Sequence, residues 1–445
     1  MKATSKLAKF IHDLSYEDLS DDAIAKAKLC LMDWLGVTVG GYAGGLGDID
    51  PMIGALQPLF GQPQATLITK KRKVDVLNAA LINGTASHYL DYDDIQSGMS
   101  GHPSVPVMPA ALAMGEYRKV DGKRFITSLV AGFEAECRIG EAVNPEHYGR
   151  GWHATATLGC FGAGAAVANM TGLSTEKVIS TLGIAGTQAF GVRQSFGTMC
   201  KPFHAGKAAS NGILAAILAE GGFTAPQEIL EGIDGFGKIY STKFDETKID
   251  KLGQPFKIEQ VIYKRYASCY FTHATVRCML GIREKHRPAL SEIDKITVKV
   301  SPLAIDVAGN PVPQTGLEGK FSLSYCAVLA LDKGQALESD FTEELVNDPE
   351  TRSLMARVVT VTDDSFTALQ SEICIELKDG SEIREKTDLI SERAVSVTGW
   401  ESILEAKTVN LIRGIFPLEV ARDAIKAIRG LEEIDDIGKV VNLLS

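Results

Sequence analysis

The 445-residue sequence has no pair of cysteines with CxxC spacing, because its eight cysteines are scattered singly. This absence excludes the usual zinc-knuckle and redox motifs and predicts reduced, mostly buried thiols. The chain also has no excess of positive charge, and its formal net charge is -10. We therefore expect no nucleic-acid partner and no docking on anionic lipid, since both need a basic surface.

Long runs of large apolar residues are absent as well. Residues 1–20 lack the apolar core of a secretory signal and soon become acidic. Residues 154–175 are uncharged, but they are rich in Gly, Ala and Thr, which favours a buried helix over a membrane span. A hydrophobic content of 45% and a charged content of 23% predict a globular protein with a large core. We expect it to be cytoplasmic.

The N-terminal half of the chain has the spacing of successive helices. In residues 20–36, Ser20 or Asp21 can cap a helix whose apolar residues recur on one stripe, and Gly36 is its expected end. Residues 157–170 are mostly small, which predicts a helix that packs closely against its neighbours. Alternation of apolar and polar residues, the mark of a strand, does not stand out here.

Alternating patterns appear after about residue 261. Residues 294–301 and 356–362 are candidate strands, and residues 371–389 contain an alternating run followed by an Asp379-Gly380 turn, which is typical of a hairpin. A helical segment lies between these candidates, and helical spacing returns near the C-terminus.

These patterns predict a mostly α fold. We expect residues 1–262 and 398–445 to form one large all-α helical domain, interrupted by a smaller α+β domain at residues 263–397. Inserted domains of this kind often close as lids over a cleft.

Residues 88–104 concentrate acids and histidines, and three interpretations of them stay open. The aspartates could cap helices while the histidines face solvent. The Asp91-Tyr92-Asp93-Asp94 sequence is also similar to the DxDD motif of some helical terpene cyclases, which suggests a Mg²⁺ or diphosphate site, although no second acidic cluster completes one. Finally, a carboxylate could fix the tautomer of a histidine such as His102 for proton transfer at neutral pH.

Four other short stretches place polar groups among small or apolar residues. They contain His153, Lys201, Lys264 and Tyr325. Each could be structural: a core histidine, two lysines that reach the surface, and a packed tyrosine. Together they suggest a pocket with two lysines, several histidines and a carboxylate, which suits a small di- or tricarboxylate.

The chain resembles the MmgE/PrpD family, which includes 2-methylcitrate dehydratases, cis-aconitate decarboxylases and iminodisuccinate epimerases. The resemblance runs along essentially the whole chain and rests on ordered motifs: HYLDYDD, GHPS, GWHATATLG, KPFHAGKAASNG, YKRYASCYFTH and GLEGKFSLSY. It implies a helical domain built from both chain ends, an inserted α+β lid and a homodimer. It also implies no metal and no cofactor, and it places the active site on Asp91, His102, His153, Lys201, Lys264 and Tyr325.

Departures from the family pattern bear on the reaction. The decarboxylases usually carry Thr where this chain has Ile95 and His where it has Cys269. The dehydratases continue GHPS with Asp-Asn, whereas this chain continues with Val105 and Pro106. Several motifs look closest to those of the epimerase. Classical methylcitrate dehydration is therefore disfavoured, while decarboxylation, elimination and epimerisation stay open.

The resemblance predicts a lyase that acts on a small di- or tricarboxylate through a carbanion or enediolate-like species. We expect His102, oriented by Asp91, to transfer the proton, with His153 as second choice, and the lysines to bind carboxylates. We expect Lys264 to come from the lid side, so that closure completes the site. The alternatives are an epimerase of the iminodisuccinate type with the same site and a non-catalytic carboxylate-binding protein with the same fold.

Overall fold

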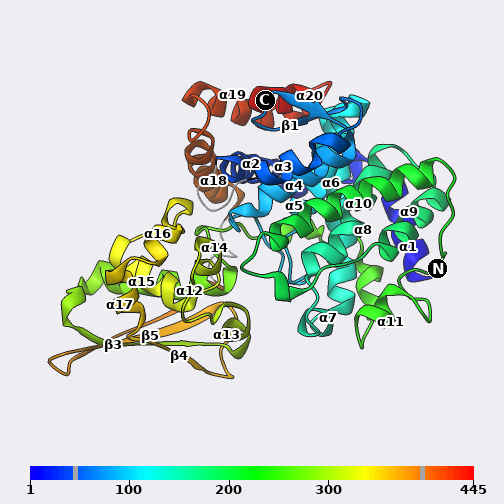
Figure 1. Cartoon of the computed structure of the whole chain (residues 1–445). Coiled ribbons are helices and arrows are strands. Elements are labelled where there is room, and N and C mark those ends of the chain that lie inside the picture. The colour runs from blue at the N-terminus through cyan, green and yellow to red at the C-terminus, as the bar shows by residue number, and fades with distance from the viewer. Residues whose placement is uncertain (44–48, 391–395) are drawn as a thin grey trace.

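The computed structural model describes residues 1–43, 49–390 and 396–445. Figure 1 shows a larger helical part, which holds both chain ends, and a smaller part that contains β3, β4 and β5. The mostly α class with a minor sheet portion is confirmed. Among the described residues, no helix is both long enough and apolar enough to cross a bilayer.

The larger part is built from helices of both chain ends and one short hairpin. Its helices are α1 (Ala3–Asp13), α2 (Asp21–Tyr42), α3 (Asp50–Leu56), α4 (Val76–Tyr89), α5 (Ser104–Arg118), α6 (Gly122–Val143), α7 (Glu146–Gly149), α8 (Ala154–Met170), α9 (Thr175–Thr187), α10 (Cys200–Glu220), α11 (Phe236–Tyr240), α18 (Val397–Ile412), α19 (Leu418–Arg429) and α20 (Gly438–Val441). The hairpin pairs β1 (Ala65–Leu67) with β2 (Arg72–Val74). This hairpin was not predicted from the sequence, because three residues per strand are too few to show alternation.

Helix α2, near the N-terminus, packs against α18, near the C-terminus. Ser20 caps it as expected, since its hydroxyl accepts a hydrogen bond from the Ala23 amide at 3.0 Å. The expectation that Gly36 ends the helix is wrong, because α2 continues to Tyr42. A Cβ at Gly36 would lie 2.9 Å from Oγ1 of Thr408 in α18. The glycine therefore permits a close helix crossing and is not a C-cap.

The smaller part contains a four-stranded sheet with the strand order β4-β3-β5-β6. Strand β3 is parallel to β4 and antiparallel to β5, and β5 is antiparallel to β6. These strands, predicted from alternation, are β3 (Ile293–Val300), β4 (Val358–Thr362), β5 (Gln370–Leu377) and β6 (Glu382–Asp388). The accompanying helices are α12 (Tyr270–His286), α13 (Pro302–Ala308), α14 (Gly316–Gly319), α15 (Leu323–Lys333), α16 (Glu343–Val346) and α17 (Pro349–Met355).

One apolar face of this sheet forms a core with α12 and α15. Ile296 and Val298 of β3 and Ile373 and Ile375 of β5 are fully buried in it. Gly380 adopts φ +85° in the turn between β5 and β6, a conformation that glycine allows without steric cost.

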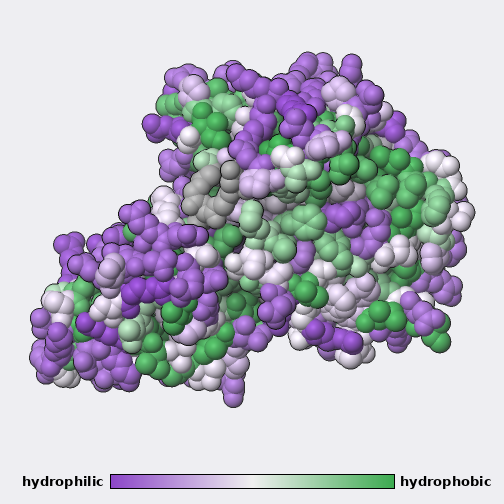
Figure 2. Space-filling view, in the orientation of Figure 1, coloured by the Kyte–Doolittle hydropathy of each residue, from purple (hydrophilic) through white to green (hydrophobic). Residues whose placement is uncertain are grey.

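The surface of the larger part retains some exposed apolar side chains. Figure 2 shows green, apolar residues over the face around α9 and α10, and in α10 itself Phe203 is 37% and Ile217 is 36% exposed. Scattered apolar residues are normal on protein surfaces. The homodimer expected from the family resemblance stays a prediction.

Close helix contacts in the larger part depend on glycine. A Cβ at Gly206 of α10 would lie 2.0 Å from the Leu81 carbonyl oxygen and 2.6 Å from Oγ1 of Thr85, both in α4. We therefore expect Gly206→Ala to lower the free energy of unfolding by about 1–3 kcal/mol, the usual range for overpacking. Chemical denaturation would show this as a lower midpoint.

Gly54→Ala is the matched control, because Gly54 also lies inside a helix but no atom meets its added Cβ within 4 Å. We expect this variant to be neutral or to stabilise the protein by about 0.5–1 kcal/mol, the usual gain from replacing a mid-helix glycine. Equal stability of the two variants would contradict the proposed close contact.

Candidate active site

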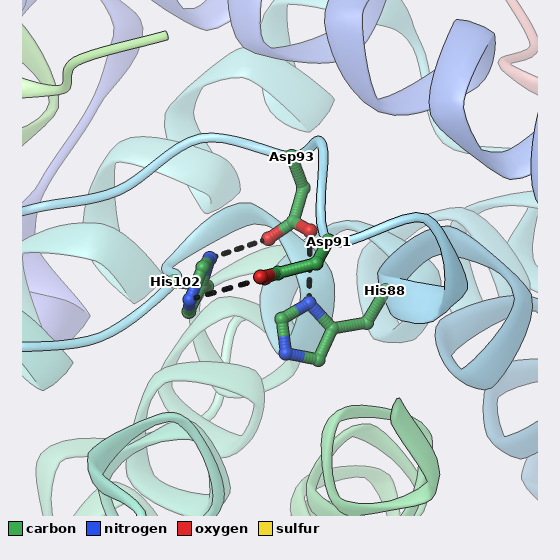
Figure 3. Close-up of side chains that lie close together, drawn as sticks. All are labelled: His88, Asp91, Asp93 and His102. Carbon is green, nitrogen blue, oxygen red and sulfur yellow. Dashed lines mark hydrogen bonds and ion pairs between the residues drawn. The ribbon is translucent and has the colours of Figure 1, made fainter. Parts of the chain in front are cut away.

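The segment that joins α4 to α5 carries most of the candidate groups. His88 lies in the last turn of α4, and the chain then turns sharply at Asp91, whose φ is +49°. Aspartate tolerates this left-handed conformation better than most residues, and such backbone strain often occurs at functional sites. The turn directs the side chains of Asp91 and Asp93 toward the histidines (Figure 3).

Asp93 bridges two histidines with its two carboxylate oxygens (Figure 3). Oδ1 lies 2.8 Å from Nδ1 of His88, and Oδ2 lies 2.8 Å from Nδ1 of His102. Nδ1 of His102 is also 3.0 Å from the Asp94 carbonyl oxygen. A ring nitrogen that faces two acceptors must carry the hydrogen. In the neutral ring, Nε2 of His102 is then the unprotonated nitrogen.

Asp91 is held by two lysines from distant parts of the chain. Its Oδ1 accepts hydrogen bonds at 2.9 Å from Nζ of Lys201 and at 2.9 Å from Nζ of Lys264. Burial raises the pKa of Asp91, but the two ammonium charges outweigh it and hold this pKa well below the usual range. Nζ of Lys201 also lies 2.8 Å from Nε2 of His88, which therefore accepts a hydrogen bond.

The histidines of this cluster are neutral near pH 7. Burial lowers the pKa of His88 to about 4. Burial also lowers the pKa of His102, and the charges of Lys264 and Lys201 add to this effect while Asp93 opposes it. Nε2 of His102 lies 3.9 Å from Oδ1 of Asp91, beyond a hydrogen bond. The arrangement thus offers an oriented imidazole that can accept a proton.

His153 forms the second histidine pair of the site. It precedes α8, and its Nδ1 lies 2.9 Å from Nδ1 of His204 in α10, so one of these nitrogens donates to the other. Nε2 of His153 and Oδ2 of Asp91 are buried, and the described residues give neither atom a hydrogen-bond partner. Buried polar atoms without partners are candidates for contacts with a ligand.

A cavity of about 410 Å³ lies over these groups. Four of the six residues that the sequence proposed line it, namely Asp91, His102, His153 and Lys201. Ile95 and Cys269, where the chain departs from the decarboxylases, line the same cavity. The positions singled out as departures therefore face the same space as the candidate catalytic groups.

Lys264 is placed differently from the expectation. It is fully buried, and it donates to the backbone carbonyl of Asp91 at 2.8 Å as well as to the carboxylate. It does not appear among the described residues that line the cavity. The expectation that it comes from a lid to bind a substrate carboxylate is not supported, because the side chain is fully buried and does not line the cavity.

Tyr325 lies outside the cavity as well. Its hydroxyl donates to the Asp340 carbonyl oxygen at 2.5 Å, and its ring packs against Phe341 in the core of the smaller part. The expectation that Asp91 orients His102 also needs correction. Asp93 contacts Nδ1 of His102 at 2.8 Å, whereas Asp91 is occupied by lysines.

Sequence reasoning missed three further residues. His88 and Asp93 lay inside the quoted cluster, but only the folded turn shows which histidine each carboxylate contacts. Lys320 was also missed: it is fully buried, and its Nζ donates to the carbonyl oxygens of Leu90 at 2.5 Å and Ala267 at 2.6 Å. Burial lowers its pKa to about 7. The position of this lysine within the motif GLEGKFSLSY was the signal that could have identified Lys320.

Asp94 contacts the start of a helix, as the interpretation of these aspartates as helix caps predicts. It accepts hydrogen bonds from Oγ of Ser104 at 2.5 Å and from the Ser104 amide at 3.2 Å, at the start of α5. Burial raises the pKa of Asp94 to about 7. This carboxyl group holds a helix end and does not face the cavity.

The donor set fits a metal ion or an iron–sulfur cluster poorly. Potential ligand atoms of His88, Asp91, Asp93 and His102 do lie within 4.8 Å of one another. However, both oxygens of Asp93 face imidazole nitrogens, and Oδ1 of Asp91 already carries two ammonium groups that would repel a cation. A cluster needs several thiolates, and Cys269 is the single cysteine among the described cavity-lining residues.

Comparison with known proteins identifies the family. The chain matches the MmgE/PrpD N-terminal domain over residues 5–248 and the MmgE/PrpD C-terminal domain over residues 266–433. Cis-aconitate decarboxylase from Homo sapiens is 25% identical over 460 residues, covering 99% of this chain and 94% of that protein. The enzyme of the same name from Aspergillus terreus is 26% identical, covering 99% and 96%.

A dehydratase is similar to this chain as well. The mitochondrial 2-methylcitrate dehydratase of Yarrowia lipolytica is 25% identical over 450 residues, covering 94% of this chain and 85% of that protein. The matched relatives are decarboxylases and a dehydratase, and this chain has a mostly helical architecture. The chain belongs to the MmgE/PrpD family.

The charges around His102 lead to a testable prediction about its pKa. In a titration followed by NMR of ¹³C-labelled histidine, we expect its ring to titrate below the ordinary histidine pKa. Asp93→Asn should lower the pKa further, because it removes the anion that stabilises the imidazolium. Lys201→Met should raise the pKa, because it removes a repelling cation.

Tyr325→Phe serves as the control, because this side chain lies in a different core and should leave the titration unchanged. Shifts of the same sign in Asp93→Asn and Lys201→Met would contradict the assigned arrangement of charges around His102.

Proposed function

We propose that the protein is a lyase that breaks a bond next to a carboxylate of a small di- or tricarboxylic acid, by decarboxylation or elimination. The observation that carries this proposal is His102, whose Nδ1 is fixed by Asp93 while its ring lines the cavity beside Lys201. A neutral, oriented imidazole can take up or return a proton at neutral pH.

The reaction leaves electrons on the carbon next to the carboxylate, and these delocalise onto the carboxylate oxygens. Lys201 is suited to stabilise this charge. Its ammonium has three N–H donors, of which Asp91 and His88 take two, so that one is left for a substrate oxygen. Donors that meet the charge as it develops stabilise the transition state more than the ground state.

The relatives support the same chemistry. Those named cis-aconitate decarboxylase break a carbon–carbon bond, and those named 2-methylcitrate dehydratase break a carbon–oxygen bond. Both reactions occur beside carboxylates. At about a quarter identity, this resemblance supports the class of reaction and leaves the substrate to experiment.

Epimerisation is the second candidate, because the cavity holds a second imidazole. Nε2 of His153 has no described hydrogen-bond partner, and both His153 and His102 line the cavity. Two histidines that line one cavity could remove a proton from one face of a carbon and return it to the other face. Such an enzyme would exchange the α-proton without changing the carbon skeleton.

We propose in addition that residues 263–397 act as a lid. The cavity is lined from both parts of the chain: Ile95 and His153 belong to the larger part, and Leu303 and Leu369 belong to the smaller part. A change in the angle between the parts would alter access to His102.

Incubation with a panel of cis-aconitate, 2-methylcitrate and iminodisuccinate in D₂O, followed by NMR, tests the proposal. Decarboxylation gives carbon dioxide, elimination gives an alkene and water, and epimerisation gives deuterium at an unchanged carbon skeleton. Deuterium exchange or inversion without loss of carbon dioxide or water would replace the lyase with the epimerase. Binding of the acids with no conversion would identify a carboxylate-binding protein.

The His102→Ala variant tests the proposed proton-transfer group. We expect it to lower kcat by roughly two to four orders of magnitude, the usual contribution of general acid–base catalysis. Steady-state kinetics on the converted acid would measure this, with circular dichroism as the check on folding. Tyr325→Phe is the control and should stay within severalfold of the wild type. Near-normal turnover of His102→Ala would move the proton-transfer role to His153.

Lys201→Ala should behave differently from the histidine variant. It removes a donor to the substrate and leaves Asp91 with one ammonium fewer, so we expect both a higher KM and a lower kcat. A change in kcat alone, measured in the same assay, would show that Lys201 does not contact the bound acid.

A further inference from the structure

We propose that the substrate carries an apolar arm, such as an alkyl chain, beside one or two carboxylates, and is not a compact tricarboxylate. This inference deepens the proposed function and rests on it. Two features of the cavity carry it: the charge of the residues that line it and the apolar character of most of its remaining wall.

The cavity has little positive charge to offer. Among the described residues that line it, Lys201 is the one lysine, arginine is absent, and Asp91 contributes a negative charge. The ammonium of Lys201 is already shared between Asp91 and His88. A tricarboxylate would bring three negative charges, and carboxylates buried without a cationic partner are costly. The polar end thus suits one carboxylate at Lys201.

A second carboxylate can be bound by neutral donors. Gln96 and Ser100 line the cavity on the side of the α4–α5 segment. Neutral hydrogen bonds are weaker than charge-assisted ones. Neutral donors are sufficient for the second carboxylate of a dicarboxylate whose first carboxylate contacts Lys201. They do not replace the cations that a third carboxylate would need.

Apolar side chains form most of the remaining wall. They come from both parts of the chain and include Ile95, Phe196, Leu303, Val307, Phe321, Leu369 and Ile390. At the edge of the cavity, Leu303 is 41% and Ile390 is 56% exposed. Large apolar residues that gather around a cavity, some of them exposed, are typical of a surface that an apolar ligand covers.

The geometry positions this wall for an arm on the substrate. His102 and Lys201 hold the carboxylate end, so a substituent on the neighbouring carbon can extend toward Leu303 and Val307 of α13. The volume of about 410 Å³ falls in the range of ordinary small-molecule pockets and exceeds what a four-carbon dicarboxylate fills.

Calorimetric titration with 2-alkylsuccinates tests the proposal, with methyl, ethyl, propyl and butyl members compared against citrate and tricarballylate. We expect the Kd to fall by about fourfold for each added CH₂ group, the ratio that corresponds to burying one methylene. The tricarboxylates should bind more weakly than 2-butylsuccinate. A flat series, or tighter binding of either tricarboxylate, would overturn the inference.

Two variants make the test specific for this wall. Leu303→Ser should reduce the gain per CH₂ group, because it replaces an apolar contact at the cavity by a hydroxyl. Leu59→Ser is the matched control: Leu59 is 71% exposed and does not line the cavity, so the series should keep its slope. Equal slopes in both variants would count against the assigned wall. These measurements need no turnover, so they test the apolar wall whether or not the D₂O assay shows conversion.

Discussion

The burial of two aspartates in one turn is the constraint on which the site depends. Asp91 and Asp93 are almost fully buried, and a buried carboxylate is stable only when cations or hydrogen-bond donors surround it. Asp91 obtains these donors from Lys201 and Lys264. Asp93 accepts a hydrogen bond from His88, and its other oxygen lies 2.8 Å from Nδ1 of His102. The same pairing that satisfies the carboxylates therefore fixes the tautomer of the base and the position of the ammonium.

The backbone of this turn is held from parts of the chain that are far away in sequence. Lys320 donates to the Leu90 carbonyl at 2.5 Å, Lys264 to the Asp91 carbonyl at 2.8 Å, and Lys407 to the Tyr92 carbonyl at 2.6 Å. Lys320 lies in the smaller part and Lys407 in α18 near the C-terminus. The backbone of the turn is thus held by both parts and by the C-terminal end of the chain. Glycines in α2, α4 and α10 allow the helices beneath it to approach closely.

The sequence predicted several of the helices, the strands of the four-stranded sheet and four of the residues that line the cavity. Ser20 as a cap and the Asp379-Gly380 turn are examples. The pairing of side chains could not be predicted, since it depends on a single residue in left-handed conformation. The expectation that Gly36 ends a helix was wrong because the residue that requires a glycine there, Thr408, lies far away in sequence. Tyr325 was misplaced because a motif does not show which core a side chain enters.

The central claim is that burial keeps His102 a neutral imidazole, with its hydrogen on Nδ1, facing Asp93 and the Asp94 carbonyl oxygen, and its free lone pair on Nε2. The ¹⁵N chemical shifts of His102 test it most directly, measured near neutral pH on uniformly labelled protein and assigned by comparison with His102→Gln. The account predicts a protonated, pyrrole-type Nδ1 and an unprotonated, pyridine-type Nε2. An imidazolium with two protonated nitrogens, or a hydrogen on Nε2 alone, would contradict it.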